Sequence, residues 1–235
     1  MKLALVTTPW TADSTVGQRT RELVRQLSDA IQFDVFVEPG LEGPDYFGWA
    51  TRSANTLVPR EHDSVLYAIG DEPAHAFMLP LVRRFGGCVA LHAWGLPQLA
   101  LAAFPELARG GWRGAWRALS EGGPSDAARY WSNRSKLGRE PVSALAELAL
   151  NRSIVRFGDA FFVADEATKK RVLDDRNAPT PICVAPFDSA GNADDWAAVA
   201  REWRTAFERF PAPRTARKSF VALRIAEGLR RADRR

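Results

Sequence analysis

Residues 2–37 read KLALVTTPWTADSTVGQRTRELVRQLSDAIQFDVFV, and this stretch decides the fold class. Its beginning, Lys2–Thr7, is a short continuous apolar run, which is typical of a strand buried on both faces of a parallel sheet. From Val16 to Ile31 the apolar side chains fall on one helical stripe, and Phe33–Val37 is a second strand-like run, closed by Pro39-Gly40. This order of strand, helix and strand predicts an α/β protein.

The same alternation continues along the chain. Further strands are expected at Ser64–Ile69, Cys88–His92, Ala160–Ala164 and Pro181–Ala185, with one short strand near Leu57. Helices are expected at Ala74–Arg84, from Leu96 to about Leu119, at Pro141–Phe157 and at Asp165–Asp174. Right-handed crossovers between such strands predict a single Rossmann-like, doubly wound parallel sheet with helices on both faces.

The pattern changes after Asp188. A polar loop, Ser189–Asp195, precedes a helical stripe made of Trp196, Val199, Trp203, Ala206, Phe207 and Phe210. Phe220–Leu229 is predicted to be a second, Arg-rich helix. No strand separates the two helices, so residues 1–188 are expected to form the sheet domain and residues 189–235 a helical C-terminal extension.

The net charge of +4 is unevenly distributed. From Arg201 onward there are 11 Lys+Arg and 4 Asp+Glu, so this tail carries +7 and the preceding residues carry −3. The basic tail is interpreted either as a solvated helix face or as a contact for an anionic membrane surface, an acidic protein face or nucleic acid. Nucleic acid is the least favoured partner, because the chain has no recognised nucleic-acid motif and Phe220 is the one aromatic residue in Arg214–Arg235.

Several classes of protein and site are excluded by what the sequence lacks. Two cysteines, Cys88 and Cys183, are too few for a disulfide scaffold or a four-cysteine zinc site, and they fit a reducing cytoplasm. No apolar run approaches the roughly 20 residues that span a bilayer, and Pro9 interrupts the N-terminus too early for a signal peptide. The chain has no P-loop, no G-x-G-x-x-G or G-x-S-x-G sequence and no histidine spacing typical of a metal site.

Ligands on doubly wound sheets bind at the carboxyl ends of the strands. Four segments follow predicted strands in this way: Thr7–Gly17, Gly70–His75, His92–Pro97 and Ala164–Thr168. In the first segment, Thr15 and Gln18 have the spacing of a capping box at a helix start. The free amides of such a helix start suit a phosphate or diphosphate, although an ordinary capped helix is the alternative.

Two histidines belong to these segments, since His92 ends one strand beside Trp94 and His75 lies near the end of another. A lone histidine is more often structural, but two at adjacent strand ends favour a polar site. The remaining histidine, His62, is interpreted as a solvated loop residue, and the neighbouring carboxylates Asp71 and Glu72 as turn and surface charges. Trp112, Trp116 and Trp131 are expected either to stack on a sugar or base or, as the favoured interpretation, to pack in a core or lid.

Four stretches, in order, resemble the N-terminal half of a family 4 glycosyltransferase of the GT-B fold. TPWTADSTVGQRTRELVRQLSDA resembles that family's loop and acceptor-side helix, and VLYAIGDEPAHAFMLPLVRR its strand ending in Gly-Asn with a following His-x-Phe. CVALHAW resembles the strand that ends in Leu-His-Asp, and LNRSIVRFGDAFFVADEATKKRVL the helix–strand–helix that closes the domain. The chain departs from the family at Ala93, where the aspartate is missing, at Thr15, where the family has a glycine, and at Asp71 and Ala164-Asp165.

The resemblance implies an acceptor-side domain that works in polysaccharide or glycoconjugate assembly in the cytoplasm, at the inner face of the membrane if the tail binds there. The second Rossmann domain, which holds the nucleotide sugar in that family, has no counterpart here, so a separate polypeptide would supply the donor and this chain would bind no cofactor or metal. His92 would be the catalytic residue that hydrogen-bonds the transferred hexose. The acceptor, a sugar or a lipid-linked sugar, and the diphosphate would be bound by Ser14, Thr15, Gly17, Gly70, His75 and Trp94.

The resemblance also implies that the Trp196–Phe210 stripe packs back on the sheet domain as the family's closing helix. The alternative function is a non-catalytic interaction or regulatory module that retains the fold. The missing carboxylate after His92 and the missing glycine at Thr15 support that alternative.

Overall fold

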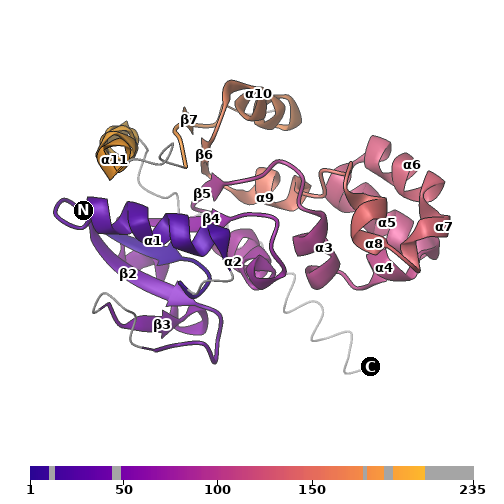
Figure 1. Cartoon of the computed structure of the whole chain (residues 1–235), viewed down its shortest axis with the longest axis horizontal. Coiled ribbons are helices and arrows are strands. Elements are labelled where there is room, and N and C mark those ends of the chain that lie inside the picture. The colour runs from indigo at the N-terminus through magenta and orange to yellow at the C-terminus, as the bar shows by residue number, and fades with distance from the viewer. Residues whose placement is uncertain (11–13, 44–48, 177–178, 188–192, 210–235) are drawn as a thin grey trace.

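The computed structural model describes residues 1–10, 14–43, 49–176, 179–187 and 193–209 (Figure 1). Phe210, the predicted helix Phe220–Leu229 and the basic tail after residue 209 lie outside the described residues. Within the described part, seven strands form one all-parallel sheet in the order β3-β2-β1-β4-β5-β6-β7. The strands are β1 (Lys2–Val6), β2 (Gln32–Val37), β3 (Thr51–Ser53), β4 (Ser64–Ile69), β5 (Cys88–Leu91), β6 (Ala160–Val163) and β7 (Ile182–Val184). The predicted α/β class with a Rossmann-like sheet is confirmed.

The continuous apolar runs form strands because both faces of the sheet are covered. Along β1, Leu3 and Leu5 enter one hydrophobic cluster whereas Ala4 and Val6 enter the other, as the two-residue period of a strand requires. All six residues of β4 are buried. A strand with a polar face would leave unpaired polar side chains under one of these layers, so only apolar runs fit the central positions.

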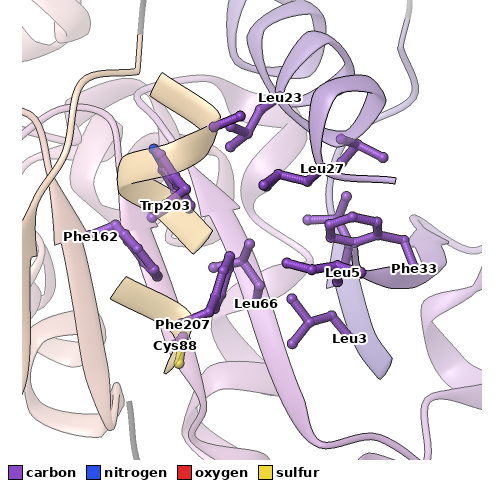
Figure 2. Close-up of a cluster of buried hydrophobic side chains, with 14 of the residues drawn as sticks. Leu3, Leu5, Leu23, Leu27, Phe33, Leu66, Cys88, Phe162, Trp203 and Phe207 are labelled. Atoms are coloured by element: carbon purple, nitrogen blue, oxygen red, sulfur yellow. The ribbon is translucent and has the colours of Figure 1, made fainter. Parts of the chain in front are cut away.

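The first face of the sheet is covered by α1 (Thr15–Leu27) and α11 (Ala193–Arg209), and the second by α2 (Met78–Phe85), α9 (Arg152–Phe157) and α10 (Glu166–Asp175) (Figure 1). The prediction that the stripe after residue 195 packs on the sheet is confirmed. In Figure 2, Trp203 and Phe207 of α11 face Phe162 of β6, next to Leu23 of α1. The rings of Trp203 and Phe162 stack with centroids 4.0 Å apart and planes 5° apart.

A lobe of short helices is inserted between β5 and β6 (Figure 1). It consists of α3 (Pro97–Ala103), α4 (Glu106–Arg109), α5 (Gly111–Gly122), α6 (Pro124–Ser132), α7 (Arg134–Leu137) and α8 (Pro141–Leu145). Its own core contains buried Leu107, Tyr130 and Leu145. Among the described residues, no helix here or elsewhere combines the length and the apolarity needed to cross a membrane.

The helix expected over Pro141–Phe157 is wrong, because it is interrupted between α8 and α9. Leu150 in this break has a positive φ of 50°, and the Asp126 carboxylate accepts hydrogen bonds from the amides of Ala149 and Leu150 at 2.8 and 3.3 Å. An apolar run therefore folds as two helices because a buried carboxylate from α6 holds the turn between them.

Two smaller expectations are also wrong. The edge strand β3 lies at Thr51–Ser53 rather than near Leu57, and two 3₁₀ turns, Ala54–Thr56 and Pro59–Glu61, follow it. The helix expected from Ala74 begins instead as a 3₁₀ turn at Pro73–His75, and α2 starts only at Met78.

Candidate functional site

The strand order reverses between β1 and β4, and the crevice at the carboxyl ends of the strands there is the usual ligand site of a doubly wound sheet. Gly70 lies directly after β4, at this edge of the sheet. A Cβ atom at Gly70 would lie 2.5 Å from Cγ2 of Val16 and 3.6 Å from atoms of both His75 and His92. The structure thus brings the start of α1 and two of the predicted site histidines to one backbone position, where no side chain fits.

The start of α1 is capped by residues from two strand ends. Ser14, one residue before the expected capping box at Thr15, is the N-cap, and its Oγ accepts the amide of Gly17 at 2.8 Å. Thr15 itself is exposed. A Cβ atom at Gly17 would lie 3.0 Å from the hydroxyl oxygens of Ser14 and Thr8, so the first turn of α1 leaves little room for a side chain there.

The residue that sequence reasoning missed is Glu72. Ser14 Oγ donates to one of its carboxylate oxygens at 2.6 Å, and the amide of Val16 donates to the other at 3.1 Å. The carboxylate of Asp71, the residue before Glu72, accepts hydrogen bonds from the backbone amides of Gln98 and Leu99 at the start of α3, at 2.7 and 3.2 Å. These two acids are therefore helix caps rather than free surface charges.

The capping changes what the α1 terminus offers to a ligand. A carboxylate already lies against the positive end of the helix, where the sequence predicts a diphosphate. The sequence contains an indication of these caps, because neither α1 nor α3 has an acidic residue in its own first turn. The acids that follow β4 fill that role for both helices.

His75 is fully buried in the crevice. Its Nδ1 lies 3.1 Å from the amide of Gly70 and 3.0 Å from the carbonyl oxygen of Gly70, and its tautomer decides which hydrogen bond forms. Its Nε2 has no hydrogen-bond partner, and Glu72 is 3.9 Å away. Burial lowers the pKa of His75 despite the opposing influence of Gly70, Glu72 and Asp71, so the ring favours the neutral state.

His92 lies against α11 rather than in an open cleft. Its ring stacks on Phe187 with centroids 4.1 Å apart, and its buried Nδ1 has no hydrogen-bond partner. The residue as a whole is half-buried, but burial of the ring, with smaller electrostatic contributions from His75 and Arg19, lowers the pKa of His92 to about 3. His92 is therefore neutral at pH 7, with one nitrogen able to donate and the other able to accept.

Little space remains beside His92. A cavity between α1, α11 and the sheet is lined by Arg19, Leu66, Phe187, Trp196, Trp203 and His92 among others. Its volume is about 10 Å³, which is room for about a single water molecule. A ligand larger than a water molecule therefore does not fit between α1 and α11.

Trp94, the remaining predicted site residue, is half-buried against the hydrophobic cluster on the second face of the sheet. Its carbonyl oxygen accepts a hydrogen bond from Asn151 at 2.5 Å, and Arg171 of α10 lies 5.9 Å from its ring centroid. In the fourth segment expected to bind a ligand, Ala164–Thr168, the exposed Asp165 is the N-cap of α10 and accepts the amide of Thr168 at 2.7 Å.

Two interpretations of single residues are wrong. His62 is buried rather than solvated, and its Nε2 lies 2.9 Å from the carboxylate of Asp34 on β2. The favoured interpretation of the three tryptophans as core or lid residues also fails, since Trp112, Trp116 and Trp131 are 71, 66 and 47 % exposed. No group of His, Cys, Asp and Glu side chains that could hold a metal ion occurs among the described residues.

No family model, no curated protein and no solved structure matches this chain.

Proposed function

We propose that the chain is a glycosyltransferase-like, acceptor-side domain that acts in polysaccharide or glycoconjugate assembly together with a separate nucleotide-sugar-binding polypeptide. The observation that carries the proposal is the pair of imidazoles, His75 and His92, beside Gly70 at the point where the strand order reverses. Each has a buried ring nitrogen without a hydrogen-bond partner. Buried polar atoms are nearly always paired in folded proteins, so two such nitrogens at the sheet edge where this fold binds ligands favour a missing polar partner.

The chemistry of these imidazoles favours hydroxyl groups over anions. Both rings have a lowered pKa and carry no charge at pH 7, so they do not attract a phosphate electrostatically. A neutral imidazole donates through one nitrogen and accepts through the other, as a sugar hydroxyl also does. A sugar or lipid-linked sugar acceptor matches this donor and acceptor set.

The donor diphosphate is better assigned to the partner polypeptide. Glu72 already occupies the amide of Val16, and its negative charge would repel a second anion at the same helix end. In this scheme, transfer takes place across a cleft between the two polypeptides, and His92 hydrogen-bonds the transferred hexose while His75 supports the acceptor. The proposal places the chain in the cytoplasm, with its Arg-rich tail available to an anionic surface.

Calorimetry tests the division of labour between the two polypeptides. The isolated chain is expected to bind uridine, guanosine and adenosine diphosphate sugars no better than about millimolar, which is about −4 kcal/mol. Micromolar binding of one of these donors would show that the chain holds the nucleotide itself and would contradict the split arrangement.

Product glycan in cells tests the role of His92. Cells that carry His92→Ala are expected to lose roughly 100–1000-fold in transfer rate, the scale for removing one hydrogen-bond donor from a transition state. His92→Gln, which keeps a donor and an acceptor, is the matched control and should retain more activity. Thermal unfolding of both purified variants separates a loss of chemistry from a loss of the Phe187 contact.

A second candidate function is a non-catalytic interaction or regulatory module with the same fold. The specific observation in its favour is that Glu72 fills the α1 terminus, so the crevice is complete without a ligand anion. The same cells distinguish the two functions. If His92→Ala retains the glycan while deletion of the gene abolishes it, the chain acts as a module and the transferase proposal fails.

A further inference from the structure

The helical lobe exposes tryptophans on a face that no other described element covers. Trp112 and Trp116 lie one turn apart on α5, so they share one face of this helix. The opposite face holds the lobe together: Gly114 and Ala118 are buried, and a Cβ atom at Gly114 would collide with Tyr130 of α6. The two tryptophans are therefore not side chains displaced from the core, because α5 has a complete core face without them.

The exposed charge of the lobe is strongly basic. Between residues 102 and 147 the exposed charged side chains comprise six basic and two acidic residues: Arg109, Arg113, Arg129, Arg134, Lys136 and Arg139 against Glu140 and Glu147. The other acids of the lobe already have partners. Glu121 pairs with Arg83 of α2 and with Arg117, Glu106 pairs with Arg117, and Asp126 accepts backbone amides.

The aromatic and basic side chains also occur together. The guanidinium of Arg113 lies 5.7 Å from the ring centroid of Trp112, and that of Arg134 lies 4.9 Å from the ring centroid of Trp131. On the outer face of α5 the exposed neighbours of the tryptophans are Arg113 and Ser120 rather than aliphatic residues. The centre of a protein–protein interface is depleted of charge, so this mixture fits that kind of partner poorly.

We propose that this lobe docks on the surface of an anionic lipid bilayer, with Trp112 and Trp116 of α5 entering the headgroup region. Tryptophan rings concentrate at the boundary between headgroups and acyl chains, and basic side chains around them are attracted to anionic lipids. The lobe lies on the bilayer and does not cross it. The proposal is independent of the glycosyltransferase assignment and concerns a surface distant from α11 and β3 (Figure 1).

Flotation of the full chain with lipid vesicles tests the proposal. The chain is expected to float with vesicles that contain phosphatidylglycerol and to remain unbound with vesicles of phosphatidylcholine alone. The Trp112→Ala/Trp116→Ala double variant should bind the anionic vesicles at least about tenfold more weakly, because it removes apolar side chains from the contact. Arg113→Gln should weaken binding about fivefold, since one basic side chain near an anionic surface contributes about 1 kcal/mol.

The matched control is Leu173→Ala, which removes an apolar side chain that is 44 % exposed on α10, outside the lobe. It should bind the vesicles as the unchanged chain does, and thermal unfolding should be the same for every variant. Equal binding to both kinds of vesicle would overturn the anionic part of the proposal. If the double variant binds the vesicles as the unchanged chain does, the contact belongs to the Arg-rich tail. If the unchanged chain binds no vesicles and the double variant instead loses self-association, the face belongs to a second copy of the chain. Either result overturns the proposal.

Discussion

Replacing Trp203 by alanine should remove the largest single contribution that α11 makes to the fold. Trp203 is 1 % exposed, lies flat on Phe162 and contacts Phe187 and Phe207, with ring centroids 5.6 and 5.9 Å away. Its Nε1 donates a hydrogen bond to the carbonyl oxygen of Pro186 at 3.1 Å. This one side chain therefore connects α11 to β6 and to the segment that follows β7.

The expected loss follows from these contacts. Truncating a buried tryptophan to alanine costs about 3–5 kcal/mol in the free energy of unfolding, since it leaves a cavity that the surroundings fill only in part. The carbonyl of Pro186 loses its donor, which adds about 1 kcal/mol. At 2–4 °C per kcal/mol for a chain of this size, the melting temperature should fall by roughly 8–24 °C.

Urea unfolding followed by far-UV circular dichroism measures the change. Trp116→Ala is the matched control, because it removes the same side chain from a helix position that is 66 % exposed, and it should stay within about 0.5 kcal/mol of the unchanged chain. If Trp203→Ala does not fold, Trp203→Phe keeps a ring on Phe162 and should give a smaller loss. A Trp203→Ala variant as stable as Trp116→Ala would refute the conclusion that α11 completes the core.

Three further predictions concern the crevice and the thiols. Glu72→Gln should lower the free energy of unfolding by about 0.5–2 kcal/mol, because it weakens the cap at Val16; an unchanged urea midpoint would contradict the capping role. Because the pKa of His92 in the folded chain, about 3, lies below its value in the unfolded chain, the free energy of unfolding should fall as the pH falls from about 6.5 toward 3. His92→Gln should make this pH dependence shallower by up to one proton. Equal slopes of the urea midpoint against pH for the two chains would show that His92 is not the titrating group. Burial raises the pKa of Cys88 to about 11, so a thiol reagent at neutral pH should label Cys88 only after unfolding. Fast labelling of two thiols in the folded chain would contradict this, because it would show that Cys88 and Cys183 are both accessible.

The central strands could be predicted because a strand covered on both faces must be apolar throughout. The expected Ser64–Ile69 coincides with β4, and Lys2–Thr7 ends one residue after β1. The edge strand Thr51–Ser53 has no such run, since its residues are half-buried or exposed and it pairs on one side with β2. Local pattern therefore identified the buried strands and misplaced the exposed one.

The errors arose where a distant side chain decides the local structure. The helix expected through Leu150 is broken by hydrogen bonds to Asp126, 24 residues earlier in the chain. His62 is buried and hydrogen-bonded only because Asp34, 28 residues away, lies on β2 within reach of its ring. Neither contact leaves a periodic trace in the sequence.

The candidate site was predicted only in part, because it too depends on contacts between residues that are far apart in the sequence. The strand-end rule correctly gathers Gly70, His75 and His92, because it depends only on the parallel direction of the strands. It does not reveal that Glu72 reaches Val16 across 56 residues of sequence and satisfies the amide that a diphosphate would need. Which hydrogen-bonding groups remain available to a ligand depends on tertiary contacts of this kind.

The position of α11 also has a consequence for how the chain folds during synthesis. Leu5 and Leu23 lie in the same buried cluster as Trp203 and Phe207, although about 180 residues of sequence separate these two groups. At a translation rate of roughly 5–20 residues per second, the nascent chain keeps that sheet face uncovered for roughly 10–40 s after the first helix has been made. Contacts between such distant segments slow folding and prolong the exposure of apolar surface. Nascent chains that stop before α11 should consequently depend on a chaperone that shields this face, and the full-length chain should be released from it once Phe207 has emerged.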